Sequence, residues 1–144
     1  MLKLELVTLS GTKSTDNVHE VILPTPDGQI AVFENHAPLV SLASTGVIKV
    51  RQKANDPDDF MDIYATAGGV IEITDNTVRV LVDEADDPDE INEQEAKEAQ
   101  EEAKNLLKTA KDQVSLAHAQ TMFDRSSVRL KVSELKNRRK RQNY

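Results

Sequence analysis

The sequence predicts an α+β protein, with an N-terminal β-sandwich followed by a C-terminal two-helix hairpin. Up to residue 84, short runs of apolar and β-branched residues alternate with Gly, Pro, Asn and Asp, a spacing typical of sandwiches. After Pro88 there is no glycine or proline, and alanine and charged residues dominate, as in helices. The 144 residues suffice for one compact core and an appendage. We therefore expect a sandwich over residues 1–84 and a helical hairpin over residues 85–144.

Alternation of apolar and polar residues predicts the strands. The expected strands cover residues 2–6, 18–23, 46–50, 61–64, 71–74 and 77–80. Asp75 and Asn76 separate the last two of these, and both residues tolerate the positive φ angles of a two-residue hairpin turn. The segment 55–59, which reads NDPDD, predicts a solvated hairpin tip.

Residues 87–90, which read DPDE, predict the start of the first helix. Asp87 can cap the helix, proline suits the first helical position, and acids complement the positive end of the helix dipole. A narrow seam of small residues follows at steps of three or four. It consists of Ala96, Ala99, Ala103, Leu106 and Ala110. Such a seam predicts a second helix packed closely against the first.

The second helix is expected after a turn at residues 111–115, with Ser115 as its cap. Its apolar face would carry Leu116, Ala119, Phe123 and Leu130. Only Asp112 and Ser115 interrupt the helical pattern at the turn, so the break is weak. One continuous helix is therefore an alternative to the hairpin.

Charge is segregated along the helical part, although the net charge of the chain is −7. Between residues 83 and 102 there are eleven acidic residues and a single base, Lys97. From residue 125 onward the sign reverses, and Glu134 is the only acid among eight bases. This pattern predicts that the two charged segments meet each other or bind different partners.

Composition argues against catalysis and against a resident metal or cofactor. There is no cysteine, and the three histidines lack the spacing of a metal site. Gly68 and Gly69 are not followed by the helix and lysine of a phosphate-binding loop, so we interpret them as a backbone feature. No nucleophile with a base and no carboxylate pair stands out. No segment has the features of a signal peptide or a membrane span, so a cytosolic location is expected.

Three blocks in a fixed order resemble the epsilon subunits of F-type ATP synthases. The first is the LPT segment at residues 23–25 with Gly28 and Ile30, and the second is NHAPL at residues 35–39 with Gly46. The third block is residues 67–73, followed after a turn by residues 76–83. No single block identifies the family, but their order does, and a charged, alanine-rich tail of the expected length follows them.

The resemblance implies a noncatalytic central-stalk subunit of a proton-translocating bacterial enzyme, peripheral to the cytoplasmic face of the plasma membrane. The sandwich would bind the gamma subunit and the c-ring, with Gln29 and Ile30 toward the ring and the loop carrying His36 and Pro38 in contact with gamma. Relatives often carry an acid where this chain has Gln29, so a ring contact would be hydrogen-bonded rather than ionic. The alternative for His36 is a bond to its own loop backbone. The helices would inhibit ATP hydrolysis in an extended form.

The resemblance also assigns roles within the helices. An inhibitory helix would face acidic surface on the catalytic alpha and beta subunits through Arg125, Arg129, Lys131, Lys136, Arg138 and Arg139. Some relatives bind ATP through a motif in which this chain has Asn92 in place of aspartate and Glu95 in place of arginine. Arg125 and Arg129 match that site's helper arginines, although both could instead pair with the acidic first helix. We therefore expect no firmly bound nucleotide and no other cofactor.

The competing interpretation is a nucleic-acid or protein-binding β-sandwich module with a basic C-terminal tail. The tail KNRRKR at residues 136–141 supports it. The sequence pI of about 5.0, the 3% aromatic content and the lack of a nucleic-acid motif argue against it. We therefore expect no binding to nucleic acid.

Overall fold

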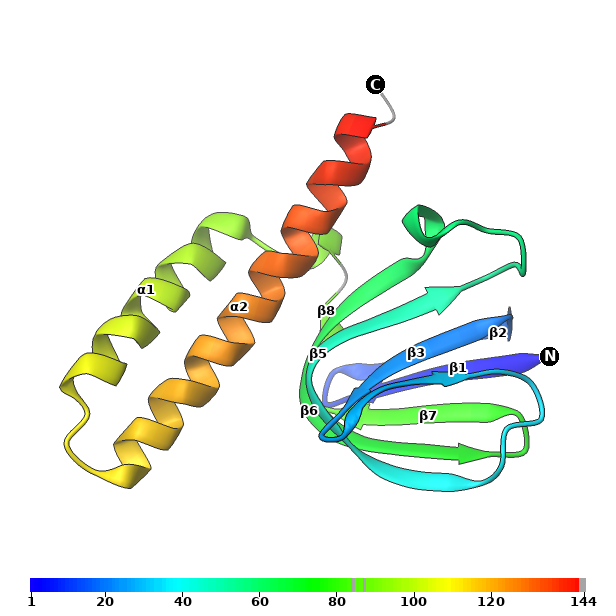
Figure 1. The fold of residues 1–144 in the computed structure, drawn as a ribbon, viewed down its shortest axis with the longest axis horizontal. Coiled ribbons are helices and arrows are strands. Elements are labelled where there is room, and N and C mark those ends of the chain that lie inside the picture. The colour runs from blue at the N-terminus through cyan, green and yellow to red at the C-terminus, as the bar shows by residue number, and fades with distance from the viewer. Residues whose placement is uncertain (84, 87, 143–144) are drawn as a thin grey trace. The chain divides into compact units, whose positions relative to one another are not determined.

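The computed structural model describes residues 1–83, 85–86 and 88–142, and for residues 90 and 138–142 it describes the backbone alone. The chain divides into two compact units, Met1–Ala85 and Asp86–Tyr144. The first unit contains the strands and the second contains the helices (Figure 1). This order of elements confirms the predicted fold class.

The strands form one sheet that folds around a core. The strands are β1 (Leu2–Thr8), β2 (Gly11–Val18), β3 (Glu20–Thr25), β4 (Gly28–Val32), β5 (Leu39–Arg51), β6 (Asp62–Thr74), β7 (Thr77–Val82) and β8 (Ala85–Asp86). Their order in the sheet is β2-β1-β7-β6-β5-β3-β4, and β8 pairs with β6. β1 and β7 are parallel, whereas the other pairs along this path are antiparallel.

The interior follows the alternation seen in the sequence. Leu2, Leu4 and Leu6 on β1 are buried, and the charged residues between them point outward. Other strands contribute Val18, Val21, Leu23, Val32, Ala43, Ile48, Val50, Ile71, Ile73, Val78, Val80, Val82 and Ala85. The hairpin turn is confirmed, since Asp75 and Asn76 have φ angles of 46° and 59° and Thr74 pairs with Thr77.

β5 and β6 are long and curved, so each contributes to both layers of the sandwich (Figure 1). On β6, Tyr64 packs against the core near one end, and Ile71 and Ile73 are buried in it near the other. The positions that pack against this core therefore change from even to odd numbers along β6, although the odd-numbered Ile63 and Ala65 beside Tyr64 are also buried. Gly68 and Gly69 lie at the change, with φ angles of 92° and 150° that suit glycine. The interpretation of this pair as a backbone feature agrees with the structure.

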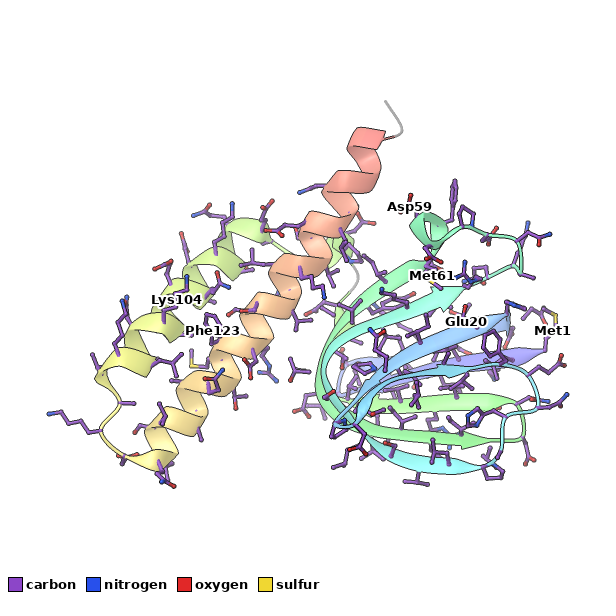
Figure 2. The ribbon with its side chains drawn as sticks, in the orientation of Figure 1. Met1, Glu20, Asp59, Met61, Lys104 and Phe123 are labelled. Atoms are coloured by element: carbon purple, nitrogen blue, oxygen red, sulfur yellow. The ribbon has the colours of Figure 1, made fainter. Side chains whose placement is uncertain are left out.

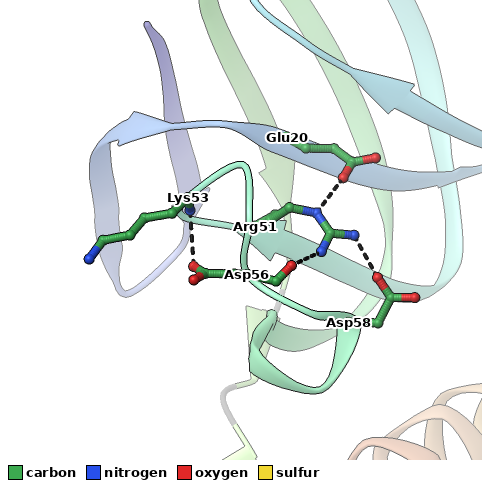
Figure 3. A network of polar contacts seen from close by, with 5 residues as sticks. All are labelled: Glu20, Arg51, Lys53, Asp56 and Asp58. Carbon is green, nitrogen blue, oxygen red and sulfur yellow. Dashed lines mark hydrogen bonds and ion pairs between the residues drawn. The ribbon is translucent and has the colours of Figure 1, made fainter.

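Arg51 organises the loop that connects β5 to β6 (Figure 3). Its Nε donates to Glu20 at 2.8 Å and its Nη2 donates to Asp58 at 2.6 Å. Nη1 donates to the carbonyl oxygen of Asp56. The guanidinium beside Asp58 lowers the pKa of that carboxyl group. The loop, predicted as a solvated tip, therefore has a fixed shape, and Asp59 lies on its short 3-10 helix η1 (Asp58–Phe60) (Figure 2).

The helical unit contains a 3-10 helix η2 (Pro88–Glu90), α1 (Glu93–Thr109) and α2 (Gln113–Gln142). The predicted start of the first helix at residues 87–90 is wrong, because α1 begins at Glu93, after the Asn92 cap. Asp87 lies outside the described residues. Ser115 is not the cap of α2, because it lies inside the helix and its N–H donates to Asp112 Oδ1 at 2.7 Å.

The seam between α1 and α2 contains small residues, as predicted. The prediction is wrong for Leu106 and Leu116, which are 38% and 47% exposed near the connection between the helices. Ala96 and Ala103 on α1 are buried. The buried residues of α2 include Ala119, Ser126 and Leu130. Across the seam, Gln100 Nε2 donates to Ser127 Oγ at 3.0 Å. The structure therefore contains the hairpin and not the continuous helix.

We expect Gly69→Ala to destabilise the chain strongly. A Cβ at Gly69 would lie 2.0 Å from the carbonyl oxygen of Leu81, so the backbone of β6 or β7 must move. The matched control is Gly11→Ala, since Gly11 also has a positive φ of 137°, but a Cβ added there would meet nothing within 4 Å. Urea unfolding should show a loss of several kcal/mol for Gly69→Ala and about 1 kcal/mol for Gly11→Ala. Equal losses would contradict the role given to the contact with Leu81.

Candidate functional site

A row of apolar side chains crosses the outer face of four adjacent strands. Leu42 pairs with Val70, Val70 pairs with Leu81, and Leu81 pairs with Val7. Leu42 is 63% exposed, Leu81 43% and Val70 39%. We call Val7, Leu42, Val70 and Leu81 the outer apolar row. A contiguous exposed set of this kind is typical of a surface that binds another protein.

A groove of about 350 Å³ adjoins one end of this row. Val7 and Leu81 belong to both, and Gly68 and Gly69 also line the groove. Leu9, on the turn between β1 and β2, is 93% exposed beside them. The glycine pair thus bends β6 and also leaves room for this hollow, a role that sequence analysis missed.

The next row on the same face is mostly charged. Arg79 donates to Glu5 at 3.0 Å and lies 3.8 Å from Glu72. Lys3 also contacts Glu5, at 3.2 Å. Hydrogen bonding to Arg79 is the main reason that the pKa of Glu5 is lowered. The charged side chains of this second row are therefore paired with one another. The outer apolar row beside them has no such polar partners and is the part of this face that a partner protein could cover.

Gln29 and Ile30 lie on the edge strand β4 and differ in environment. The turn before them is closed by Thr25 Oγ1, which donates to the carbonyl oxygen of Gly28 at 2.6 Å. Gln29 is exposed, whereas Ile30 packs against the core. Of the two predicted ring contacts, Gln29 therefore has the accessible side chain.

The loop with His36 and Pro38 is tied to the β6–β7 turn. Asn35 has a positive φ of 63°. Its N–H donates to Asn76 Oδ1 at 2.6 Å. His36 Nδ1 lies 2.7 Å from the carbonyl oxygen of Ala37, so this side chain bonds to its own loop backbone. Pro38 is exposed. Asn76 is a supporting residue that sequence analysis treated only as part of a turn.

The four candidate ATP-site residues are not joined into one site. Asn92 Oδ1 accepts the N–H of Glu95 at 3.2 Å, so the amide serves as the cap of α1. Arg129 Nε lies 3.3 Å from Asp86 Oδ2. The Nε atom of Arg125 is buried without a hydrogen-bond partner. Within the described part of the chain, no hydrogen bond or ion pair links Asn92 or Glu95 to either arginine.

Residues of the basic helix α2 contact the acidic segment around the start of α1. Besides the Arg129–Asp86 pair, Lys136 forms an ion pair with Asp89. Asn137 Nδ2 lies 3.4 Å from Glu93 Oε2. Lys131 is exposed, and the side chains of Arg138 and Arg139 lie outside the described residues. Of the two arginines predicted to pair with the acidic first helix, Arg129 therefore pairs with Asp86, which lies before α1.

The described residues contain neither a metal-binding cluster nor a helix that could cross a membrane. No group of three or more His, Cys, Asp or Glu side chains among them is arranged to hold a metal ion. None of the described helices combines the length and the apolar character that a membrane span needs.

Both parts of the chain match models of one protein family. Residues 1–88 match the beta-sandwich domain of the ATP synthase delta/epsilon chain. Residues 89–134 match the long alpha-helix domain of the same chain.

Similar proteins carry related names. An ATP synthase epsilon chain of Herpetosiphon aurantiacus is 30% identical, and the match covers 96% of this chain and 98% of that protein. An ATP synthase epsilon chain of Staphylococcus aureus is 32% identical, and the match covers 94% of this chain and 98% of that protein. The chloroplastic epsilon chain of Oltmannsiellopsis viridis is 37% identical, with 80% and 84% covered.

Solved structures share the fold. A chain of the Euglena gracilis mitochondrial ATP synthase matches with a TM-score of 0.74 at 20% identity, over 90% of this chain and 79% of that chain. A chain from the central stalk and c-ring structure of the Tetrahymena thermophila mitochondrial ATP synthase matches with a TM-score of 0.64 at 15% identity. This match covers 92% of this chain and 96% of that chain.

We expect weak or undetectable ATP binding by the isolated chain. If the carboxylate of Glu95 lay about 4 Å from a triphosphate, charge repulsion would reduce the binding free energy. The loss would be about 1 kcal/mol in water and about 4 kcal/mol at a protein surface. Each 1.4 kcal/mol weakens binding about tenfold. The double variant Asn92→Asp, Glu95→Arg should bind ATP better, because aspartate keeps the helix cap. Titration calorimetry measures this, with the double variant Asn92→Asp, Glu98→Arg as a control of equal charge change. Tight binding by the unmodified chain would contradict the prediction.

Proposed function

The chain belongs to the ATP synthase delta/epsilon chain family, and from this membership we propose that it works as the noncatalytic epsilon subunit of a bacterial F-type ATP synthase. Its role is mechanical. Residues 1–84 couple the rotor to the catalytic head, and residues 85–144 regulate ATP hydrolysis. The complex holds the chain at the cytoplasmic face of the plasma membrane as a peripheral subunit.

The observation that carries the coupling role is the outer apolar row. Full burial of a Val or Leu side chain stabilises a complex by about 1.5–3 kcal/mol relative to exposure. Leu42, Val70 and Leu81 lie side by side on adjacent strands, so one flat partner surface can cover all three. We assign this surface to the gamma subunit. The row lies on a sheet that is packed over a continuous apolar core, and the transmission of torque requires a well-packed element of this kind.

The c-ring contact is assigned to Gln29 on β4, supported by Ile30. An amide offers hydrogen bonds to the polar loops of a ring without a fixed charge. The tied loop that contains His36 and Pro38 supplies a second contact with the central stalk, and Asn76 holds its shape.

Regulation is assigned to the helices. In the hairpin, Arg129 and Lys136 are paired with Asp86 and Asp89. An extended form would release these cations toward the acidic surface of the alpha and beta subunits, where the helix would block hydrolysis. The Lys136–Asp89 pair makes a nucleic-acid-binding tail the weaker proposal, because one cation of the tail at residues 136–141 is already neutralised.

The coupling role predicts that Leu42→Asp weakens binding to the gamma subunit at least tenfold, because a buried carboxylate would lie at the centre of the contact. Phe60→Asp is the matched control, since Phe60 is 67% exposed but follows the opposite end of β5. Surface plasmon resonance with immobilised gamma subunit measures both, and circular dichroism checks that both variants are folded. Unchanged affinity for Leu42→Asp would remove the row from the interface.

The regulatory role predicts that a chain ending at Thr109 raises ATP hydrolysis when it replaces the full chain in the reassembled complex. Proton pumping per ATP should stay largely intact, because the sandwich is unchanged. Steady-state hydrolysis and quenching of a pH-sensitive dye report the two quantities. If hydrolysis with the shortened chain equals that with the full chain, the helices do not inhibit this enzyme.

A further inference from the structure

The break between α1 and α2 contains no residue that forbids a helix. Ala110 follows the end of α1 with an extended conformation, φ −63° and ψ 125°. Lys111 and Asp112 complete the connection to Gln113. Alanine and lysine are among the best helix formers, and neither glycine nor proline is present. Some other interaction must therefore favour the break.

Asp112 supplies that interaction at the start of α2. Its Oδ1 accepts the N–H of Ser115 at 2.7 Å, and its carbonyl oxygen accepts the N–H of Leu116 at 3.1 Å. The hydrogen bond from Ser115 lowers the pKa of the Asp112 carboxyl group. In a continuous helix the N–H of Ser115 would bond to a backbone carbonyl instead, so this carboxylate would lose its partner.

The seam can open without leaving serine hydroxyls unpaired. Ser126 Oγ donates to the carbonyl oxygens of Met122 and Phe123 at 2.9 and 3.0 Å, and Ser127 Oγ donates to that of Phe123 at 2.7 Å. These bonds lie within α2 and survive its separation from α1. The exposed Asn137–Glu93 contact and the Gln100–Ser127 hydrogen bond exchange their partners for water. Opening therefore avoids the usual penalty for unpaired buried polar groups.

We propose that the carboxylate of Asp112 locks α1 and α2 as a hairpin, and that removal of this cap fuses them into one continuous helix. A helix over residues 93–142 would be about 75 Å long at 1.5 Å per residue. The inference deepens the proposed regulatory function, but the conformational equilibrium can be measured without any partner.

Asp112 shares its surroundings with few charged groups. It lines a hollow of about 380 Å³ with Lys111 and His118, and α1 contributes Leu106 and Thr109, which are uncharged. The ionised carboxylate favours the hairpin, so the lock is fully present above the ordinary pKa of aspartate. It is lost as the pH falls through the lowered pKa in the hairpin.

The test uses the full chain with spin labels at Glu98→Cys and Lys131→Cys. The chain has no cysteine of its own, and both positions are exposed. In the hairpin the labels are close, because they flank the Gln100–Ser127 contact. In a continuous helix, 33 residues would separate them by about 50 Å. Pulsed electron paramagnetic resonance measures the fraction of molecules at each distance.

Asp112→Ala should raise the ratio of long to short distances about tenfold, because the cap is lost and alanine favours a continuous helix. Asp112→Asn should match the unmodified chain at neutral pH, since asparagine caps equally well. As the pH falls below the ordinary pKa of aspartate, long distances should increase more in the unmodified chain than in Asp112→Asn, because the asparagine amide does not titrate.

Ala103→Asp is the positive control, because a carboxylate in the buried seam must open it. If Ala103→Asp shows long label distances and Asp112→Ala does not, the proposed lock is wrong. It is also wrong if neither variant shows long distances. ATP hydrolysis by the complex with Asp112→Ala tests the function separately. Fused helices without increased inhibition would support the lock and contradict the regulatory proposal.

Discussion

The close contact of Gly69 with the backbone of Leu81 is the constraint on which the sandwich depends. It allows β6 to change which of its faces points inward, so that Tyr64 and Ile71 both pack against one core. The same change turns Val70 outward between Leu42 and Leu81. Around Val70 the strand alternates regularly, so that Ile71 and Ile73 enter the core while Val70 joins the outer row.

The helical unit is held by weaker and more reversible interactions. Its seam consists of small side chains that bury little area each, and its turn is fixed by one cap. A cap contributes about 1 kcal/mol, and exposed ion pairs contribute less. The sandwich has a continuous core of large apolar residues instead. This difference fits the proposed division between a sandwich that transmits force and helices that change conformation.

Much of the fold could be predicted from the sequence, because periodicity and turn residues act locally. The 71–80 hairpin and the alanine seam are examples. β2 could not be predicted, because it is an almost fully exposed edge strand and its polar residues show no alternation. The helix starts were misplaced since Asp87, Asn92, Asp112 and Ser115 are all suitable caps, and only packing selects among them.

The site was harder to predict than the fold, since it depends on which strands become neighbours. Leu42 and Leu81 are 39 positions apart in the chain, and only the sheet order β7-β6-β5 places both beside Val70. Pro24 and Gly46 illustrate the same limit. The family blocks contain both residues, but only the structure explains the pair, because a Cβ at Gly46 would lie 2.8 Å from Pro24 Cβ.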